Sequence, residues 1–291
     1  METRPLGDTG QESSVLTFGS IALDSLEQPA ATRAVELLLD RGVNHVDVAP
    51  TYGDAEVKLA PALADHREEV FLGCKTKARD YEGAWEKLEA SRDRLGVDRI
   101  DLHQFHAVTE RSEIDEITGD GGALAAFREA REEGIVDHVG LTSHGHPDVI
   151  LEAIDRIDDL ETVMFPMNYV VAGKDDPEHA YGRVLRRAEA DGLGTIGIKA
   201  FAREPWPGDL PEERRPYATW YRPRDTAAEI DDAVNFALSQ GLTSITSAGD
   251  PKLLSAILDA AERFEPLDEA EQAALVERGR EGESPVPRPG P

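Results

Sequence analysis

Four residues of types that carry proton-transfer chemistry occur in order along the first third of the chain: Asp47, Tyr52, Lys75 and His106. Each lies at or just beyond the end of a short apolar run that is typical of a buried strand. A phenol is a reluctant acid near neutral pH because its reference pKa is about 10. An ammonium within reach favours the phenolate and strengthens the phenol as a proton donor. We therefore predict that Tyr52 protonates a substrate oxygen, with Lys75 lowering its pKa.

The other two residues complete this arrangement. Lys75 must stay charged in a place partly shielded from water, so it requires a counter-ion, and Asp47 is the candidate. His106 could orient a carbonyl group by hydrogen bonding or share the proton relay. A purely structural interpretation, in which Lys75 and Asp47 form an ion pair and the Tyr and His side chains have hydrogen-bond partners, can account for each residue separately. It does not explain why all four should converge on one face, so the functional interpretation is preferred.

Reduction of a carbonyl also requires a hydride source, which none of these side chains can be, so a cofactor is expected. The segment 192–197 matches the letters of a G-x-G-x-x-G dinucleotide motif. It follows a helical pattern and enters a strand, which is the reverse of the required context, so we interpret it as a helix stop and a turn. His144 and His146 lack a nearby third metal ligand, and a ligand contact from His144 is the preferred interpretation, with no metal site predicted. Cys74 is interpreted as a packing residue.

The elements that must position these residues alternate regularly between strand and helix. We predict strands near 14–19, 43–48, 69–75, 99–105, 135–141, 161–165, 193–199 and 243–247, and helices near 30–41, 55–65, 81–95, 121–133, 147–157, 178–191, 226–240 and 251–263. Eight such units fit either a closed (β/α)8 barrel or a doubly wound open sheet. Candidate groups at the ends of three successive strands favour the barrel, because closure directs those ends to one mouth.

Three segments lie outside this repeat. Residues 3–18 predict an N-terminal β-hairpin, and 268–280 predict an extra C-terminal helix. The segment 203–224 is too long for a simple connection, and it is either a lid or substrate wall containing Trp206 and Trp220 or a surface excursion. Residues 1–280 are predicted to form one barrel domain, and the Pro- and Gly-rich tail 281–291 is predicted to be disordered.

The ordered set of motifs resembles the aldo-keto reductase superfamily over nearly the whole chain. The stretch Pro5-Leu6-Gly7-Asp8-Thr9-Gly10 is similar to that family's hairpin, which plugs the barrel floor. The stretch 42–53 is similar to its signature around the catalytic Asp and Tyr, Lys75 matches its catalytic Lys, and 101–106 places its catalytic His at His106 rather than His103. The resemblance implies an α/β fold, a TIM barrel that binds NADP(H) or NAD(H) across its mouth and reduces aldehydes or ketones, or runs in reverse.

The resemblance also implies contacts to the cofactor, and these transfer unevenly. The expected cofactor-binding residues are Gly19, Ser20, Asp47, Ser143, His144, Ser247 and Lys252, and the expected substrate-binding residues are Tyr52, His106, Trp206 and Trp220. His144 stands where the family has Asn, and Met164 where it has Gln. Leu253 occupies the place of an Arg expected to bind a 2′-phosphate, and Lys252 is the candidate to replace that Arg as a point charge. The choice between NADP and NAD is therefore open.

Composition limits the classes of partner. The chain has 58 acidic and 31 basic residues among 291, giving a formal net charge of −27. This charge disfavours nucleic acid and anionic membranes as partners, and it favours a salt-adapted (halophilic) source. One cysteine and the lack of an apolar leader or a long apolar run predict a cytoplasmic location. The oligomeric state is left open.

The function predicted from sequence is an NAD(P)H-dependent oxidoreductase acting on small carbonyl or alcohol substrates. The alternative is a catalytically quiet barrel that binds nicotinamide nucleotide as a sensor or scaffold, which the altered cofactor contacts motivate. A third possibility is a lyase or isomerase that uses Tyr52, Lys75 and His106 for proton transfer without a redox step.

Overall fold

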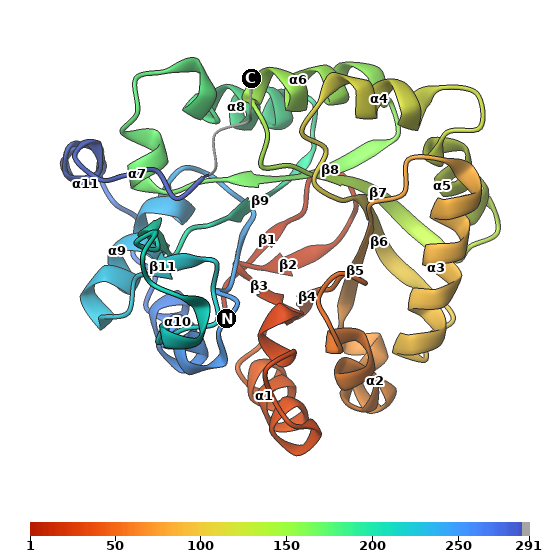
Figure 1. The fold of residues 1–291 in the computed structure, drawn as a ribbon, viewed down its shortest axis with the longest axis horizontal. Helices are drawn as coiled ribbons and strands as arrows, with labels where there is room; N and C mark the ends of the chain where they lie inside the picture. Colours follow the sequence, from red (N-terminus) through yellow and green to blue (C-terminus); the bar gives the residue numbers. More distant parts are fainter. Residues whose placement is uncertain (287–291) are drawn as a thin grey trace.

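A computed structural model describes residues 1–286. Eight parallel strands close into a barrel in the order β12-β3-β4-β5-β6-β7-β8-β9 (Figure 1). They are β3 (Leu16–Gly19), β4 (His45–Asp47), β5 (Phe71–Thr76), β6 (Ile100–Phe105), β7 (Val136–Thr142), β8 (Leu160–Pro166), β9 (Gly194–Ile198) and β12 (Ser244–Thr246). The predicted (β/α)8 barrel is confirmed, and the open-sheet alternative is wrong.

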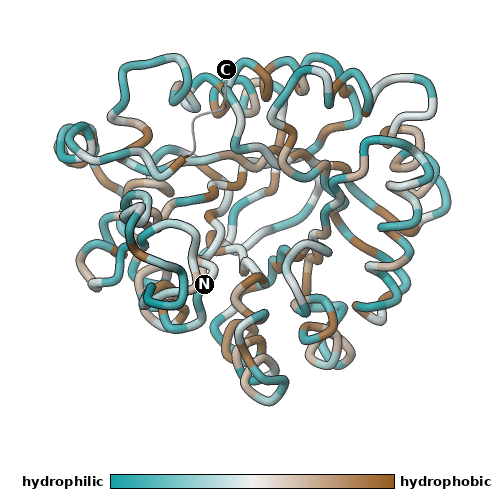
Figure 2. The backbone as a smooth tube through the Cα atoms, viewed as in Figure 1, coloured by the Kyte–Doolittle hydropathy of each residue, from teal (hydrophilic) through white to brown (hydrophobic). Residues whose placement is uncertain are grey.

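Helices surround the barrel, and hydrophilic segments follow the outer edge of the molecule (Figure 2). They are α1 (Gln28–Asp40), α2 (Ala55–His66), α3 (Tyr81–Leu95), α4 (Arg111–Thr118), α5 (Ala123–Glu132), α6 (Pro147–Arg156), α7 (Tyr169–Ala172), α8 (Gly182–Ala190), α9 (Ala227–Ser239), α10 (Leu254–Glu262) and α11 (Glu269–Arg280). Alternation along the strands divides the apolar side chains between two places. Outward-facing residues pack against the helices, and inward-facing residues fill the barrel.

The N-terminal hairpin closes the barrel floor. Strands β1 (Thr3–Pro5) and β2 (Glu12–Ser14) pair antiparallel, and the turn between them carries Leu6 into the barrel interior beside Phe71 and Leu102. The turn lies so close to the start of β9 that a Cβ atom on Gly7 would meet the amide nitrogen of Gly194 at 2.2 Å. Gly7 also has a φ of +55°, which favours glycine. The expected hairpin is therefore present and docked.

The segment 203–224 is partly regular. Strands β10 (Ala202–Pro205) and β11 (Tyr221–Pro223) form a second antiparallel hairpin, which extends from the end of β9 over the barrel mouth. The carboxylate of Asp250 accepts a hydrogen bond of 2.7 Å from the amide of Ala218. This bond ties the hairpin to the loop that follows β12.

The C-terminal segment corrects one prediction. Residues 281–286 are packed rather than disordered: Val286 is buried, and the Ser284 hydroxyl lies 2.9 Å from the imidazole of His179. The Lys174 ammonium donates to the carbonyl oxygens of Arg280 and Gly282, which fixes the chain as it leaves α11. The remainder of the predicted tail, 287–291, lies outside the described residues. Within residues 1–286, no helix has the length and apolarity that a membrane crossing requires.

Candidate active site

Lys75 lies at the centre of the four residues identified from the sequence. It points into the barrel from β5, and its ammonium pairs with the carboxylate of Asp47 on the neighbouring strand β4. The same ammonium contacts the Tyr52 hydroxyl at 3.3 Å. Tyr52 stands in the turn between β4 and α2, whereas Asp47 ends β4 itself. The pairing of two adjacent parallel strands thus brings Lys75 beside Asp47 and Tyr52, which precede it by 28 and 23 residues in the sequence.

A buried amide supports this group from the next strand. Gln104 of β6 donates from Nε2 to the second carboxylate oxygen of Asp47 at 3.0 Å. Its own carbonyl oxygen accepts from the Thr142 hydroxyl of β7 at 3.4 Å. Both oxygens of Asp47 are therefore bound, which fixes the carboxylate facing Lys75. Buried charges require such full pairing.

Burial governs the pKa values of this group. It raises the pKa of Asp47, although Lys75 and Gln104 oppose the rise. Burial acts to lower the pKa of Lys75, but the combined effects of Asp47 and Tyr52 outweigh burial and raise that pKa above its ordinary value, so the ammonium stays charged. Burial also raises the pKa of Tyr52 above 10.0, and the field of Lys75 only reduces that rise. This corrects the expectation of a net lowering: Lys75 lowers the pKa of Tyr52 only relative to what burial alone would give, and the phenol keeps its proton at neutral pH.

His106 follows β6 and faces the same side as Tyr52. The two rings are edge to face, with centroids 6.0 Å apart and an interplanar angle of 88°. The next residue, Ala107, has a φ of +56°, a strained conformation for a residue with a Cβ atom. His106 rather than His103 lines the cavity, because His103 points outward and its ring centroid lies 4.4 Å from that of Phe127.

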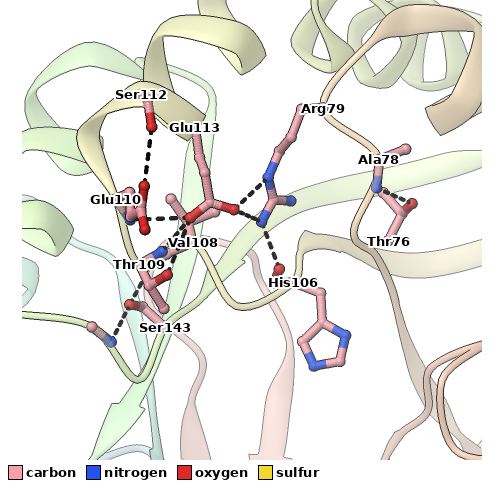
Figure 3. A network of polar contacts seen from close by, with 11 residues as sticks. Thr76, Ala78, Arg79, His106, Val108, Thr109, Glu110, Ser112, Glu113 and Ser143 are labelled. Atoms are coloured by element: carbon pink, nitrogen blue, oxygen red, sulfur yellow. Dashed lines mark hydrogen bonds and ion pairs between the residues drawn. The ribbon is translucent and has the colours of Figure 1, made fainter. Parts of the chain in front are cut away.

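An ion pair holds the backbone at His106 (Figure 3). Arg79 donates from Nη2 to the His106 carbonyl oxygen at 2.8 Å, and the same guanidinium binds Glu113 of α4 at 2.7 and 3.0 Å. The other oxygen of Glu113 accepts from the amides of Thr109 and Glu110. The turn after β6 is thereby fixed from both sides, with the imidazole pointing away from this network (Figure 3).

The imidazoles at this end of the barrel are neutral near pH 7. Burial, reinforced by Lys75 and Lys77, lowers the pKa of His106 to about 2. Burial, reinforced by Lys199, Lys75 and Lys77, lowers the pKa of His144 to about 3. Each can therefore donate from one ring nitrogen and accept at the other.

These groups border a cavity of about 330 Å³ at the carboxyl ends of the strands. Three of the four candidate residues line its wall: Asp47, Tyr52 and His106. The carboxyl-terminal mouth is where α/β barrels keep their chemistry. Lys75 lies just behind this wall, with no exposed surface.

A family model provides an independent comparison. The Aldo/keto reductase family matches residues 15–205, which is most of the barrel and includes Asp47, Tyr52, Lys75 and His106. The chain belongs to the aldo-keto reductase family. Members of this family generally bind NAD(P)H and act on small carbonyl compounds.

Individual relatives are distant. An uncharacterized oxidoreductase of Bacillus subtilis is 28% identical over 170 residues, which is 54% of this chain and 53% of that protein. The L-galactose dehydrogenase of Arabidopsis thaliana is 27% identical over 173 residues, with 54% and 53% covered. The chain thus matches about half the length of these curated relatives. Among solved structures, an aldo-keto reductase of Bacillus halodurans has a TM-score of 0.72 at 22% identity, covering 96% of each chain. That structure has the same fold.

The expected ligand-binding residues of this aldo-keto reductase divide into two groups. Gly19, His144, Ser247 and Trp220 line the cavity. Ser20, Ser143, Lys252 and Trp206 do not. Ser20 is fully buried, and the Ser143 hydroxyl donates to the Val108 carbonyl oxygen and accepts from the amide of Gly145.

The other two residues of the second group hold the loop above the cavity. The Lys252 ammonium donates to the Pro216 carbonyl oxygen at 2.8 Å, and the indole nitrogen of Trp206 donates to the Thr219 carbonyl oxygen at 2.6 Å. Sequence spacing could not show that backbone carbonyl oxygens already accept from the side-chain donors of Ser143, Lys252 and Trp206.

The polar groups at one end of this cavity fit the nicotinamide end of a dinucleotide. The Thr246 hydroxyl and the Nδ1 atom of His144 are buried without a hydrogen-bond partner among residues 1–286, so both are available to an amide or a ribose hydroxyl. Gly19 and Gly249 line the cavity with backbone only. The 2′-phosphate end fits less well, because Leu253 is buried and Lys252 is engaged.

Three functional candidates were missed from the sequence. Gln104 carries a recognisable signal, because it alternates with Leu102 on the inward face of β6 and with His106 just beyond the end of that strand. Lys77 and Lys199 line the cavity from the turns after β5 and β9. Lys199 has a φ of +63°, and its ammonium lies over the rings of Trp220 and Tyr221. That contact depends on the fold of the β10–β11 hairpin, which the sequence does not reveal.

Proposed function

We propose that this aldo-keto reductase reduces aldehydes or ketones to alcohols, or catalyses the reverse reaction, with Tyr52 as the general acid and a nicotinamide dinucleotide as the hydride source. The observation that carries the proposal is the contact of a cavity-lining phenol with a buried, fully paired Lys–Asp couple. A purely structural role for the ion pair would not account for a phenol in contact with it at the cavity wall.

The proposed proton donor is in the correct state. Burial keeps the pKa of Tyr52 above 10.0, so the hydroxyl carries a proton at neutral pH. As negative charge develops on a substrate oxygen, that proton transfers and leaves a tyrosinate. The Lys75 ammonium at 3.3 Å stabilises the tyrosinate, and Asp47 keeps Lys75 charged throughout.

His106 acts in this proposal as a neutral hydrogen-bond donor. Its pKa of about 2 excludes an imidazolium as the proton source near pH 7. A neutral imidazole beside Tyr52 can donate to the carbonyl oxygen and hold it facing the phenol. Arg79 and Glu113 keep the imidazole in that position through the backbone.

When bound, the dinucleotide supplies the hydride, which no protein side chain can provide. Thr246, Ser247 and His144 would hold its nicotinamide end, and the β10–β11 hairpin would shield it from water. A small molecule is the expected partner.

The direct test replaces Tyr52 with Phe, which removes only the hydroxyl. Turnover of a panel of aldehydes and ketones, followed by the absorbance of the reduced nicotinamide, should fall by about 10²–10⁴-fold. The matched control is Tyr81→Phe, because the Tyr81 hydroxyl binds Glu129 on the outer surface. Near wild-type turnover by Tyr52→Phe would exclude the assigned role.

The same assays separate the alternatives. Nucleotide binding by fluorescence without turnover of any carbonyl compound would favour the sensor or scaffold. Absence of nucleotide binding would favour a lyase or isomerase that uses the same residues for proton transfer.

A further inference from the structure

The cavity carries positive charge in a strongly negative protein. Its lining includes two lysines, Lys77 and Lys199, and one carboxylate, Asp47, which the ammonium of Lys75 neutralises. The chain has only seven lysines against 58 acidic residues. Two of the seven therefore line one cavity, and a third stands directly behind it. A surface composed at random from this sequence would put carboxylates there instead.

Lys199 is held in place without a counter-ion. Its backbone adopts a φ of +63°, and its carbonyl oxygen accepts from the side-chain amide of Asn168 at 2.9 Å and from the Ala202 amide at 3.1 Å. Its ammonium lies 4.6 Å from the ring centroid of Trp220 and 5.4 Å from that of Tyr221. No carboxylate pairs with it among residues 1–286. Aromatic faces attract a cation but leave its charge available to an anion.

Lys77 supplies a second charge from another wall of the cavity. It follows β5 by one residue, and its ammonium forms no ion pair within the described part of the chain. The charges of both lysines act on the imidazole of His144, and that of Lys77 also acts on His106. The two ammonium groups therefore act at the end of the cavity where the proposed reaction occurs.

We propose that this site prefers carbonyl compounds that also carry a carboxylate, with Lys199 and Lys77 binding the carboxylate while Tyr52 and His106 face the carbonyl oxygen. This inference rests on the proposed reductase function. The carboxylate is unchanged in the reaction, so it contributes binding and orientation only. The cofactor's pyrophosphate is the other possible anion, but a ribose separates it from the nicotinamide ring. Cations beside the reacting end therefore match a substrate anion better.

The burial of Lys199 adds a pH dependence to the proposal. Burial and the charge of Lys75 lower the pKa of Lys199 to about 8. Below that pH the ammonium binds a carboxylate, and above it the free amine does not. The rings of Trp220 and Tyr221 face the Lys199 ammonium, and the titratable groups that interact with its charge are the imidazole of His144 and the ammonium of Lys75. The preference for charged substrates should therefore decline as the pH rises through about 8.

The test compares each acid with its own methyl ester, since the two differ mainly in charge. Succinic semialdehyde and 4-carboxybenzaldehyde are measured beside their esters with the full-length protein at saturating nucleotide. We expect kcat/KM to be at least tenfold higher for the acids at pH 7. Lys199→Met should lower the acid-to-ester ratio about tenfold or more, and Lys77→Met should lower it less. The matched control is Lys87→Met, because Lys87 pairs with Glu86 on the outer surface.

Each outcome has a distinct meaning. Equal kcat/KM for acid and ester in an active enzyme overturns this inference and leaves the proposed reductase function intact. No turnover of acids, esters or simple aldehydes overturns both. If Lys199→Met and Lys77→Met weaken nucleotide binding tenfold in a fluorescence titration and leave the acid-to-ester ratio unchanged, the anion is the pyrophosphate and the inference is wrong. Circular dichroism and melting curves check that each variant is folded.

Discussion

Lys75 and Asp47 form an ion pair in which the two side chains are 0% and 2% exposed. Neither charge can be solvated if its partner is lost, so this pair links the stability of the fold to the proposed catalysis. Removing one partner of a buried pair leaves an uncompensated charge and costs about 3–5 kcal/mol. Burying the pair costs desolvation free energy, and its effect is to hold a charged ammonium beside the Tyr52 hydroxyl.

Asp47→Asn should therefore lower the free energy of unfolding by about 3–5 kcal/mol, measured by urea denaturation. The double variant Asp47→Asn with Lys75→Met should recover part of that loss, because no buried charge remains. Asp148→Asn is the control: its pair with Arg183 is nearly half exposed and contributes less than about 1 kcal/mol. A double variant less stable than Asp47→Asn alone would contradict this account. Activity should be absent from both Asp47 variants.

Arg79 positions His106 without touching the cavity. Arg79→Met removes the hydrogen bond to the His106 carbonyl oxygen and leaves Ala107 free to relax from its φ of +56°. A charge-assisted hydrogen bond contributes about 1.5–3 kcal/mol. If the whole of that free energy serves to position the imidazole for the reaction, its loss lowers kcat by about 10–100-fold. The dissociation constant of the nucleotide should change little.

The control for this prediction is Arg92→Met, since Arg92 pairs with Glu89 on α3, away from the mouth. A second variant, Glu113→Gln, keeps the shape of the network and weakens its charge, so it should give an intermediate kcat. Equal losses of kcat in Arg79→Met and Arg92→Met would show that the effect is general destabilisation.

Buried histidines predict instability in mild acid. Burial lowers the pKa of His45, His103 and His144 to about 3 and that of His106 to about 2, against 6.5 in an unfolded chain. Below pH 6.5 these histidines bind protons in the unfolded state but not in the folded state. The free energy of unfolding therefore falls as the pH falls from 6.5 toward 3. At pH 5 each such histidine removes about 2 kcal/mol.

The measurement is the free energy of unfolding between pH 7.5 and 5 (~0.5-unit steps). His103→Leu should make the decline shallower by about one proton, because His103 is fully buried and neither ring nitrogen has a partner among residues 1–286. His66→Gln is the control. His66 is exposed, and Glu69 raises its pKa, so its removal should not make the decline shallower. A pH-independent stability over this range would refute the prediction.

Sequence patterns recovered the barrel because its strands and helices repeat the same local signals. Helix α3 was predicted with its observed limits, since Asp80 caps its start and Gly96 ends it in a left-handed conformation. Helix α4 was missed: it spans only Arg111–Thr118, and just Ile114 and Ile117 are buried. Its role is to present Glu113 to Arg79, a contact that no local pattern encodes.

The four candidate residues, Asp47, Tyr52, Lys75 and His106, could be found from the sequence for the same reason, because they stand at or just beyond strand ends whose order is fixed. The surrounding contacts were not, because they depend on loops. Lys252 and Trp206 were expected at the ligand, but their donors bind the backbone carbonyls of Pro216 and Thr219. Lys199 was overlooked as a cation, because only the β10–β11 hairpin places two aromatic rings beside it.

The excess of acidic residues predicts a dependence on salt. Many surface Arg–carboxylate pairs should weaken as salt rises, but a net charge of −27 means that repulsion exceeds attraction. Since screening shortens from about 10 Å at 0.1 M to about 3 Å at 1 M, the free energy of unfolding should rise with KCl. KCl is preferred to sulfate, which stabilises most proteins by exclusion. A stability that is constant or falls between these concentrations would argue against adaptation to salt.

Finally, the residues around Leu253 predict that this aldo-keto reductase binds NADH at least as tightly as NADPH. Leu253 is buried and offers no donor, Lys252 is bound to the Pro216 carbonyl oxygen, and the carboxylate of Asp250 lies in the same turn. A 2′-phosphate would gain no charge-assisted hydrogen bond here and would meet a negative neighbour. Fluorescence titrations should give a dissociation constant for NADPH no lower than that for NADH. Lys252→Met should change both constants by less than about threefold, since its ammonium already has a partner. A tenfold loss confined to NADPH would instead identify Lys252 as the phosphate ligand and require the loop at Pro216 to open.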